Sequence, residues 1–205
     1  MNRIKICAWF VCLALAPLAH ARKTVLPDAC GDPKVEFQVK AVDDHSQPLT
    51  PDAGKALLVF VEENKDWGSN VTIRYGLDGV WVGATHGSQY FLVPLTLGEH
   101  HLCASMQGKL GMGSPEHYVG TESLTAEAGK VYFYGAVVAI VGSGGSAGST
   151  VVVPAPAGSM GAPTIVNTGG GGGNRMITVS YGFLKEDDGK YRVKAGKMAV
   201  AKPEQ

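Results

Sequence analysis

Apolar and polar residues alternate along much of the chain after residue 34, with the period of two that is typical of half-buried β-strands. The alternation is clearest at 35–39 and 71–75, whereas 56–61 is a continuous apolar run rich in β-forming residues. No stretch of twelve residues has an amphipathic helical period. We therefore predict an all-β protein, an antiparallel β-sandwich, with further strands at 80–82, 90–95, 100–104 and 130–141.

Turn residues separate these strands. Asp78 and Gly79 lie between two strand-like stretches, and glycine accepts the positive φ that a tight turn requires, so we predict a hairpin there. Near the C-terminus, 176–184 is typical of a closing strand. The segment 185–189 that follows, with acidic residues at 186–188, fits either a turn into a further strand at 191–193 or the start of a short helix.

A long uncharged segment precedes the closing strand. No charged residue occurs between Lys130 and Arg175, and residues 142–173 hold 11 of the 28 glycines. This composition is typical of a flexible linker, so we predict a Gly-rich loop at 142–173 inserted into the sandwich. Apolar pieces without charges nearby also make 136–166 a candidate for peripheral membrane contact or self-assembly.

The first 21 residues have the features of a secretory signal peptide. Basic residues precede an apolar stretch at 6–18, which ends in the cleavage pattern Ala19-His20-Ala21. We predict cleavage after Ala21 and a single β-sandwich domain at 22–205. Export would place it in the periplasm, on the outer envelope or outside the cell.

Net charge narrows the range of partners. The chain has 18 basic and 18 acidic residues, so its formal net charge is zero. A nucleic-acid-binding domain needs an excess of basic residues to neutralise phosphates, and we predict no nucleic-acid partner.

Export also changes what the cysteines indicate. Cys30 and Cys103 are the two cysteines outside the predicted signal peptide. In an oxidising compartment such a pair most simply forms a disulfide, and no C-x-x-C pattern suggests metal or redox chemistry. We predict a Cys30–Cys103 disulfide.

The histidines raise the question of a metal site. A zinc site needs three or four converging ligands. His100 and His101 are adjacent in a predicted strand, so their side chains should point to opposite faces. A metal-dependent periplasmic enzyme using His86, His100, His101 and His117 is therefore an alternative hypothesis without a spacing signature. We predict no cofactor.

Hydrolase and acid–base motifs are also weak. The sequence contains no G-x-S-x-G pattern, and its carboxylate pairs at 43–44, 62–63 and 187–188 are contiguous. Contiguous pairs at turns and strand ends are typically solvated, so we expect surface charges there.

Some of the aromatic residues could form a ligand platform. Trp81 has the opposite parity to Val80 and Val82, which would place it on the outer face of its strand. With Trp67 and Tyr90 it is a candidate binding surface for a glycan, a peptide or a partner strand.

Several short segments resemble, in order, the bacterial envelope family catalogued as domain of unknown function 2846. The match covers about residues 54–134 and includes Glu127-Ala128-Gly129-Lys130, with the pieces at 54–60, 77–83, 87–91, 98–103 and 124–134. The resemblance implies a small β-sandwich of the cell envelope without assigned chemistry. It supplies no catalytic residue, and the chain lacks the lipid-accepting cysteine of many members.

Together these patterns predict an exported, non-catalytic envelope module that binds or scaffolds a protein or glycan. An exposed sheet edge, an aromatic face or the Gly-rich loop could carry the binding. The alternatives are the metal-dependent enzyme and a surface protein that self-assembles through its Gly-rich segment.

Overall fold

The computed structural model of the protein describes residues 26–64, 71–107, 119–142, 151–152, 165–166 and 175–204. The predicted signal peptide with Ala21, the aromatic residue Trp67 and the histidine His117 lie outside the described residues. So does most of the predicted loop at 142–173.

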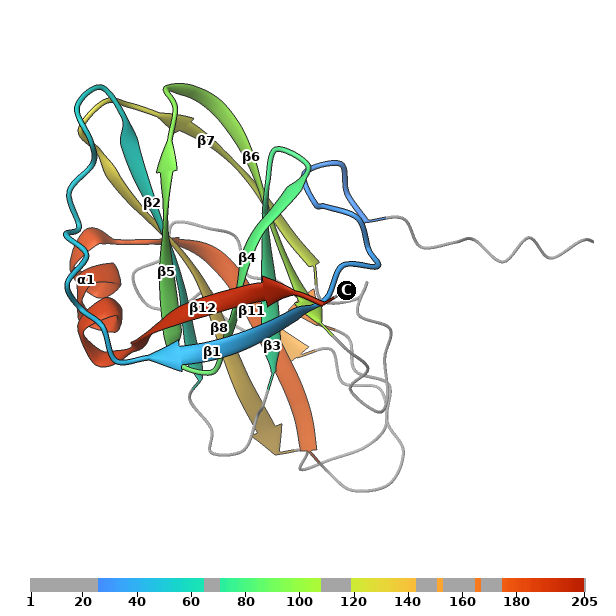
Figure 1. Cartoon of the computed structure of the whole chain (residues 1–205). Coiled ribbons are helices and arrows are strands. Elements are labelled where there is room, and N and C mark those ends of the chain that lie inside the picture. The colour runs from blue at the N-terminus through green and yellow to red at the C-terminus, as the bar shows by residue number, and fades with distance from the viewer. Residues whose placement is uncertain are drawn as a thin grey trace, which may run out of the picture.

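The described chain is almost entirely β-structure (Figure 1). Its elements are β1 (Phe37–Val42), β2 (Ala56–Asn64), β3 (Thr72–Leu77), β4 (Val80–His86), β5 (Gln89–Leu95), β6 (Gly98–Gln107), β7 (Val119–Ala126), β8 (Val131–Gly142), β9 (Val151–Val152), β10 (Ile165–Val166), β11 (Arg175–Leu184), α1 (Glu186–Ala195) and β12 (Lys197–Pro203).

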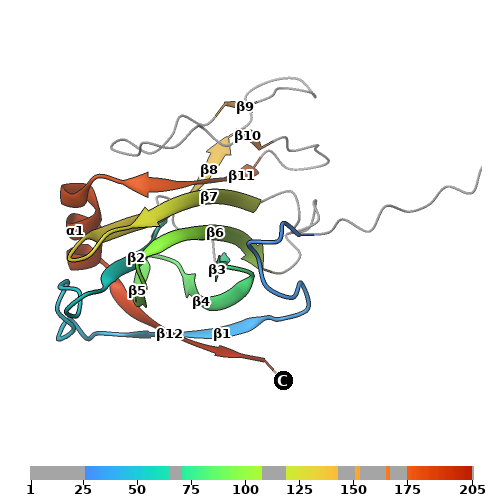
Figure 2. The ribbon, with the colours of Figure 1, turned by 90° about the horizontal axis from the view of Figure 1, so that it is seen from above.

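The strands form a sandwich-like fold of two main sheets. One has six strands in the order β1-β12-β5-β2-β8-β11, and the other has four in the order β4-β3-β6-β7. Figure 2, seen from above, shows β6 and β7 side by side along the smaller sheet. The short strands β9 and β10 pair with each other.

The prediction of a wholly antiparallel sandwich is wrong for the larger sheet. There β2 pairs with β8, and β5 with β12, in parallel. Parallel neighbours need a crossover connection, and here the chain passes through the other sheet before it returns in the same direction. Alternation along one strand does not reveal which strand becomes its neighbour.

The central strand β2 explains the continuous apolar run. Leu58 and Phe60 face the smaller sheet, where Phe60 packs on Tyr75 at 4.7 Å between ring centroids. Val59 and Val61 face the other way, into a second core cluster that includes Val193 of α1. Because both faces of β2 are buried, apolar residues are required at successive positions.

The segment that follows β11 forms the short helix and not the further strand. Residues 186–195 form α1, whose first turn carries three acidic side chains and whose last turn carries Arg192 and Lys194. Both placements are favourable for the helix dipole. Within the described residues, no helix has the length and apolar character needed to cross a membrane.

The predicted hairpin is confirmed. Asp78 and Gly79 join β3 to β4 with φ of +52° and +83°. Positive φ at both central turn residues is the pattern that favours Asp-Gly.

Candidate functional site

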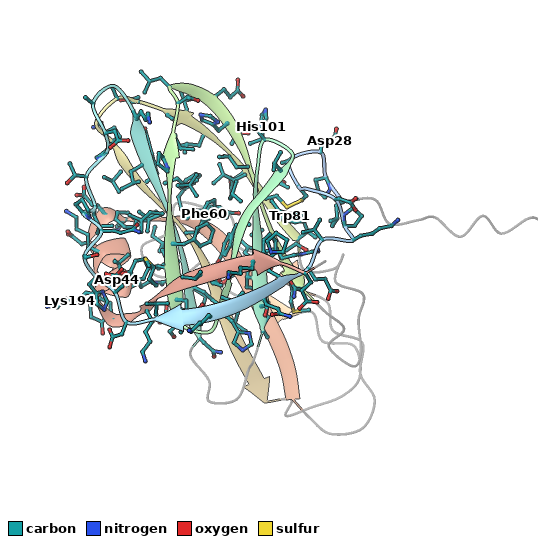
Figure 3. The ribbon with its side chains drawn as sticks, in the orientation of Figure 1. Asp28, Asp44, Phe60, Trp81, His101 and Lys194 are labelled. Carbon is teal, nitrogen blue, oxygen red and sulfur yellow. A yellow bond between two sulfur atoms is a disulfide. The ribbon has the colours of Figure 1, made fainter. Side chains whose placement is uncertain are left out.

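The segment 26–36, here called the N-terminal strap, crosses the outer face of the four-stranded sheet. Cys30 in the strap forms a disulfide with Cys103 of β6, with 5.2 Å between the two Cα atoms (Figure 3). The predicted disulfide is confirmed. Leu102 and Ala104 face the core between the sheets, so Cys103 faces outward and meets the strap.

Two side chains of the sheet bind the strap through its backbone. The Arg74 guanidinium donates to the carbonyl oxygens of Val35 at 2.6 Å and Pro33 at 3.2 Å. It also stacks over the Trp81 ring, 4.5 Å from the ring centroid. The Trp81 indole N–H donates to the carbonyl oxygen of Asp32 at 2.8 Å.

The strap lies so close to the sheet that a glycine is needed. A Cβ built at Gly31 would lie 2.4 Å from Cδ1 of Trp81, well inside van der Waals contact. Gly31 therefore lets the strap backbone reach the position at which Trp81 can donate to it.

The candidate aromatic surface does not form as one exposed patch among the described residues. Trp81 lies on the outer face of β4, as its parity indicates, but it is half-buried under the strap. Tyr90 is only 3% exposed, and its hydroxyl donates to the carbonyl oxygen of Asp44 at 2.9 Å. Parity identified the face of Trp81 but not the segment that covers it.

Three of the candidate metal ligands, His86, His100 and His101, lie within the described residues. His86 contacts the Thr72 hydroxyl through Nδ1 at 2.9 Å. His100 is buried and His101 is exposed, which confirms that they point to opposite faces. In the described part of the chain, no three His, Cys, Asp or Glu side chains are grouped to hold a metal.

The Asp78 carboxylate joins the β3–β4 turn to the start of β6. One oxygen accepts from the His101 backbone N–H at 2.8 Å, and the other lies 2.6 Å from Nδ1 of His100. The Asp78 backbone N–H in turn donates to the His101 carbonyl oxygen at 2.8 Å. The left-handed φ of Asp78 is therefore held by its own carboxylate and backbone.

His100 is held between two acceptors. Its Nδ1 meets the Asp78 carboxylate, and its Nε2 lies 3.0 Å from the carbonyl oxygen of Thr96. Both contacts are satisfied only by the doubly protonated imidazolium. Burial, the largest influence, lowers the pKa of His100, but the hydrogen bonds to Asp78 and Thr96 outweigh it and the net pKa is raised.

We expect the His100 interaction to stabilise the protein at low pH. Because the folded pKa is raised, this stabilisation is fully present below the unfolded value of 6.5 and is lost as pH rises through the folded pKa. His100→Gln should lower the free energy of unfolding by about 1–2 kcal/mol at pH 5.5, the scale of a charge-assisted hydrogen bond to a half-exposed carboxylate. Denaturant unfolding from pH 5.5 to 9 should show this difference shrinking. His101→Gln, which removes the exposed neighbouring imidazole, is the matched control. A pH-independent effect of His100→Gln would contradict the assignment.

The N-terminal strap, the β3–β4 turn and β7 line an open groove of about 820 Å³, here called the strap groove. Its lining residues are Pro27, Asp28, Ala29, Asp78, His101, Thr121, Glu122 and Ser123. Figure 3 shows Asp28 and His101 on the side of the molecule that the strap crosses. Three of these residues are acidic and none is Lys or Arg.

The floor of the strap groove is polar. His101 and Ser123 are direct cross-strand neighbours on β6 and β7, and Nδ1 of His101 lies 3.2 Å from the Ser123 hydroxyl oxygen. Thr121 and Ser123 are exposed. Sequence reasoning missed this site, although hydroxyl residues at 121, 123 and 125 alternate with other residues in a way that marks one accessible strand face.

The expectation of solvated carboxylate pairs is wrong for Glu62. It is 2% exposed, at the end of β2 on the face toward the smaller sheet. The Thr85 hydroxyl lies 2.6 Å from one carboxyl oxygen, and the Gly87 N–H donates to the other at 3.0 Å. Burial raises the pKa of Glu62 to about 8, against these hydrogen bonds, which lower it.

Comparisons with known proteins give no homologue from which to carry over a function. No family model, curated protein or solved structure matches the chain.

Proposed function

We propose that this chain is an exported, non-catalytic module of the bacterial cell envelope that binds a partner in the strap groove. The observation that carries the proposal is the groove itself, an open concavity of about 820 Å³ with a polar floor. Concave surfaces with a few placed polar groups are the usual form of binding sites. The secretory pattern at 1–21 and the resemblance over 54–134 support a place in the envelope.

The charge of the strap groove favours a cationic group on the partner. Among the described residues that line it, Asp28 has an exposed carboxylate, Asp78 shares its carboxylate with His100, and none is Lys or Arg. Complementary charge raises association rates and selects among partners. A protein segment with Lys or Arg provides such a group and a neutral glycan does not, so we propose a protein partner.

Amide NMR spectra recorded with two probes test this function. Pentalysine should shift the resonances of the groove residues, and a neutral oligomer of N-acetylglucosamine should not. Asp28→Asn should weaken pentalysine binding about fivefold, since one exposed charge pair contributes up to about 1 kcal/mol. Asp187→Asn removes an exposed charge from α1 and is the matched control.

Two kinds of result would contradict the proposed function. Shifts outside the groove, or equal effects of the two variants, would show that pentalysine binds non-specifically. Groove shifts with the oligosaccharide alone would keep the groove as a site and replace the protein partner with a glycan.

A further inference from the structure

The strap groove reaches the main chain of an edge strand. It is lined by Thr121, Glu122 and Ser123, three successive residues of β7. Successive side chains of a strand point to opposite faces, so a surface formed by all three includes the strand's own backbone. Among the strands that the structure describes, β7 is the last of its sheet and pairs with β6 alone.

The direction of the β7 backbone groups follows from the neighbouring hydrogen bonds. Ser123 lies opposite His101, whose N–H and C=O are both bonded to Asp78 on the other side of β6. The His101–Ser123 pair is therefore a non-hydrogen-bonded pair, in which the backbone groups of both residues point away from each other. The N–H and C=O of Ser123, and by alternation those of Thr121, point out of the sheet edge.

One end of this edge is occupied by a tyrosine of the other sheet. The Tyr132 hydroxyl donates to the carbonyl oxygen of Thr125 at 3.2 Å and accepts from the N–H of Glu127 at 3.1 Å. Toward the other end, the face of β7 at Gly120 packs against the side chain of Tyr181. Between them, the backbone groups of Thr121 and Ser123 have no hydrogen-bond partner among the residues that the structure describes.

Two other sheet edges are protected. At β1, the Gln107 side-chain amide bonds both the N–H and the C=O of Phe37, at 2.7 and 2.9 Å. At β4, the register shifts between Tyr75 and Gly76, and Trp81 is bonded to the strap. Bulges and covering groups of this kind prevent a strand from pairing with another chain. The centre of β7 has an unbroken register instead.

We propose that the partner binds as an extended peptide that adds a short strand to β7 at Thr121 and Ser123. The inference rests on the proposed function of the strap groove and specifies its ligand. Backbone hydrogen bonds to the two exposed residues would hold the peptide. A Lys or Arg side chain of the peptide would lie against Asp28, which gives the charge complementarity.

The probe for this proposal is an acetylated, amidated heptapeptide of alternating valine and lysine. Amide exchange at Thr121 and Ser123, measured by NMR, should be fast in the free protein and at least tenfold slower with the peptide. The same peptide with alternate backbone amides methylated keeps its charges but loses donors, and should bind at least tenfold more weakly. Equal affinity of the two peptides, or unchanged exchange at both residues, would overturn strand addition.

Ser123→Pro gives a second arm within the protein. Proline is tolerated at an edge position whose N–H points outward, and it removes the donor that the peptide uses. Ser123→Ala removes only the hydroxyl and is the matched control. Binding should be lost in the proline variant, and the alanine variant should bind the peptide at least tenfold more tightly than the proline variant. Equal affinity of the two variants would overturn the proposal. If the proline variant does not fold, the comparison of the methylated and unmethylated peptides tests strand addition.

The remaining outcomes separate this inference from the proposed function. Suppose that pentalysine shifts the groove resonances but the heptapeptide does not slow amide exchange at Thr121 and Ser123. This result would contradict strand addition and leave the groove as a binding site. No groove shift with any probe would remove both. Slow, concentration-dependent exchange at Thr121 and Ser123 without peptide would point to a second copy pairing through β7, and would also overturn the proposal.

Discussion

Replacing both cysteines, Cys30→Ala with Cys103→Ala, should lower the free energy of unfolding by about 4 kcal/mol. The disulfide joins residues 73 apart in sequence, so in the chain-entropy model it strongly restricts the unfolded chain. Denaturant unfolding monitored by tryptophan fluorescence measures the change. The signal is direct because Trp81 packs beside the disulfide under the strap.

The same variant should also lose pentalysine binding. Cys30 directly follows the strap residues that form one wall of the groove. Arg74 and Trp81 bind the strap at residues 32–35, on the far side of Cys30. Their contacts therefore do not replace the disulfide as the covalent anchor of the groove wall. Wild-type protein unfolded with and without a reductant is the control, and should reproduce the stability difference. A loss below 1 kcal/mol would mean that the strap is held by its backbone contacts alone.

Glu62→Gln should make the protein more stable at neutral and alkaline pH. The pKa of Glu62 is raised to about 8 from 4.5, so the folded protein keeps a proton that the unfolded chain releases between these values. Stability therefore falls as pH rises from 4.5 to 8, by about 3 kcal/mol at pH 7. Glutamine has the shape of the protonated acid and does not ionise.

The hydrogen bonds around Glu62 fit this substitution. A protonated carboxyl can donate to the Thr85 hydroxyl, which lies 3.3 Å from the Tyr75 hydroxyl, which in turn donates to the Val61 carbonyl oxygen at 3.4 Å. A glutamine amide donates to Thr85 equally well and still accepts from the Gly87 N–H.

Unfolding free energies from pH 4 to 9 give the measurement. The advantage of Glu62→Gln should grow through this range and level off above pH 8. Glu63→Gln is the matched control: that carboxylate is ion-paired with Arg192 at 2.7 Å, and its loss should bring no gain. A Glu62→Gln variant no more stable than wild type at pH 7 would contradict the raised pKa of Glu62.

Local patterns predicted the local features of this fold. The period-two alternation gave the strands, and Asp78-Gly79 gave the hairpin, because both depend on residues adjacent in sequence. The Cys30–Cys103 pairing was predictable since only two cysteines remained after the predicted signal peptide. Elements whose state depends on distant packing were ambiguous, and α1 is one of them.

The candidate site depends on contacts that no local pattern contains. The exposed backbone of Ser123 follows from the pairing of β7 with β6 and from the side of β6 that Asp78 occupies. The burial of Tyr90 and Glu62 likewise depends on segments that reach them from elsewhere in the chain. A single sequence shows the face of a strand, and only the fold shows what covers that face or leaves it open.

Photo-crosslinking in a bacterium that expresses the chain tests the central claim most directly. A photoreactive amino acid at Ser123 would lie in the strap groove, and the same group at Tyr191, 70% exposed on α1, would serve as the control. We predict a discrete protein adduct from position 123 that is absent from position 191 and is diminished by Asp28→Asn. No adduct at position 123, or the same adducts from both positions, would contradict a binding site in the groove.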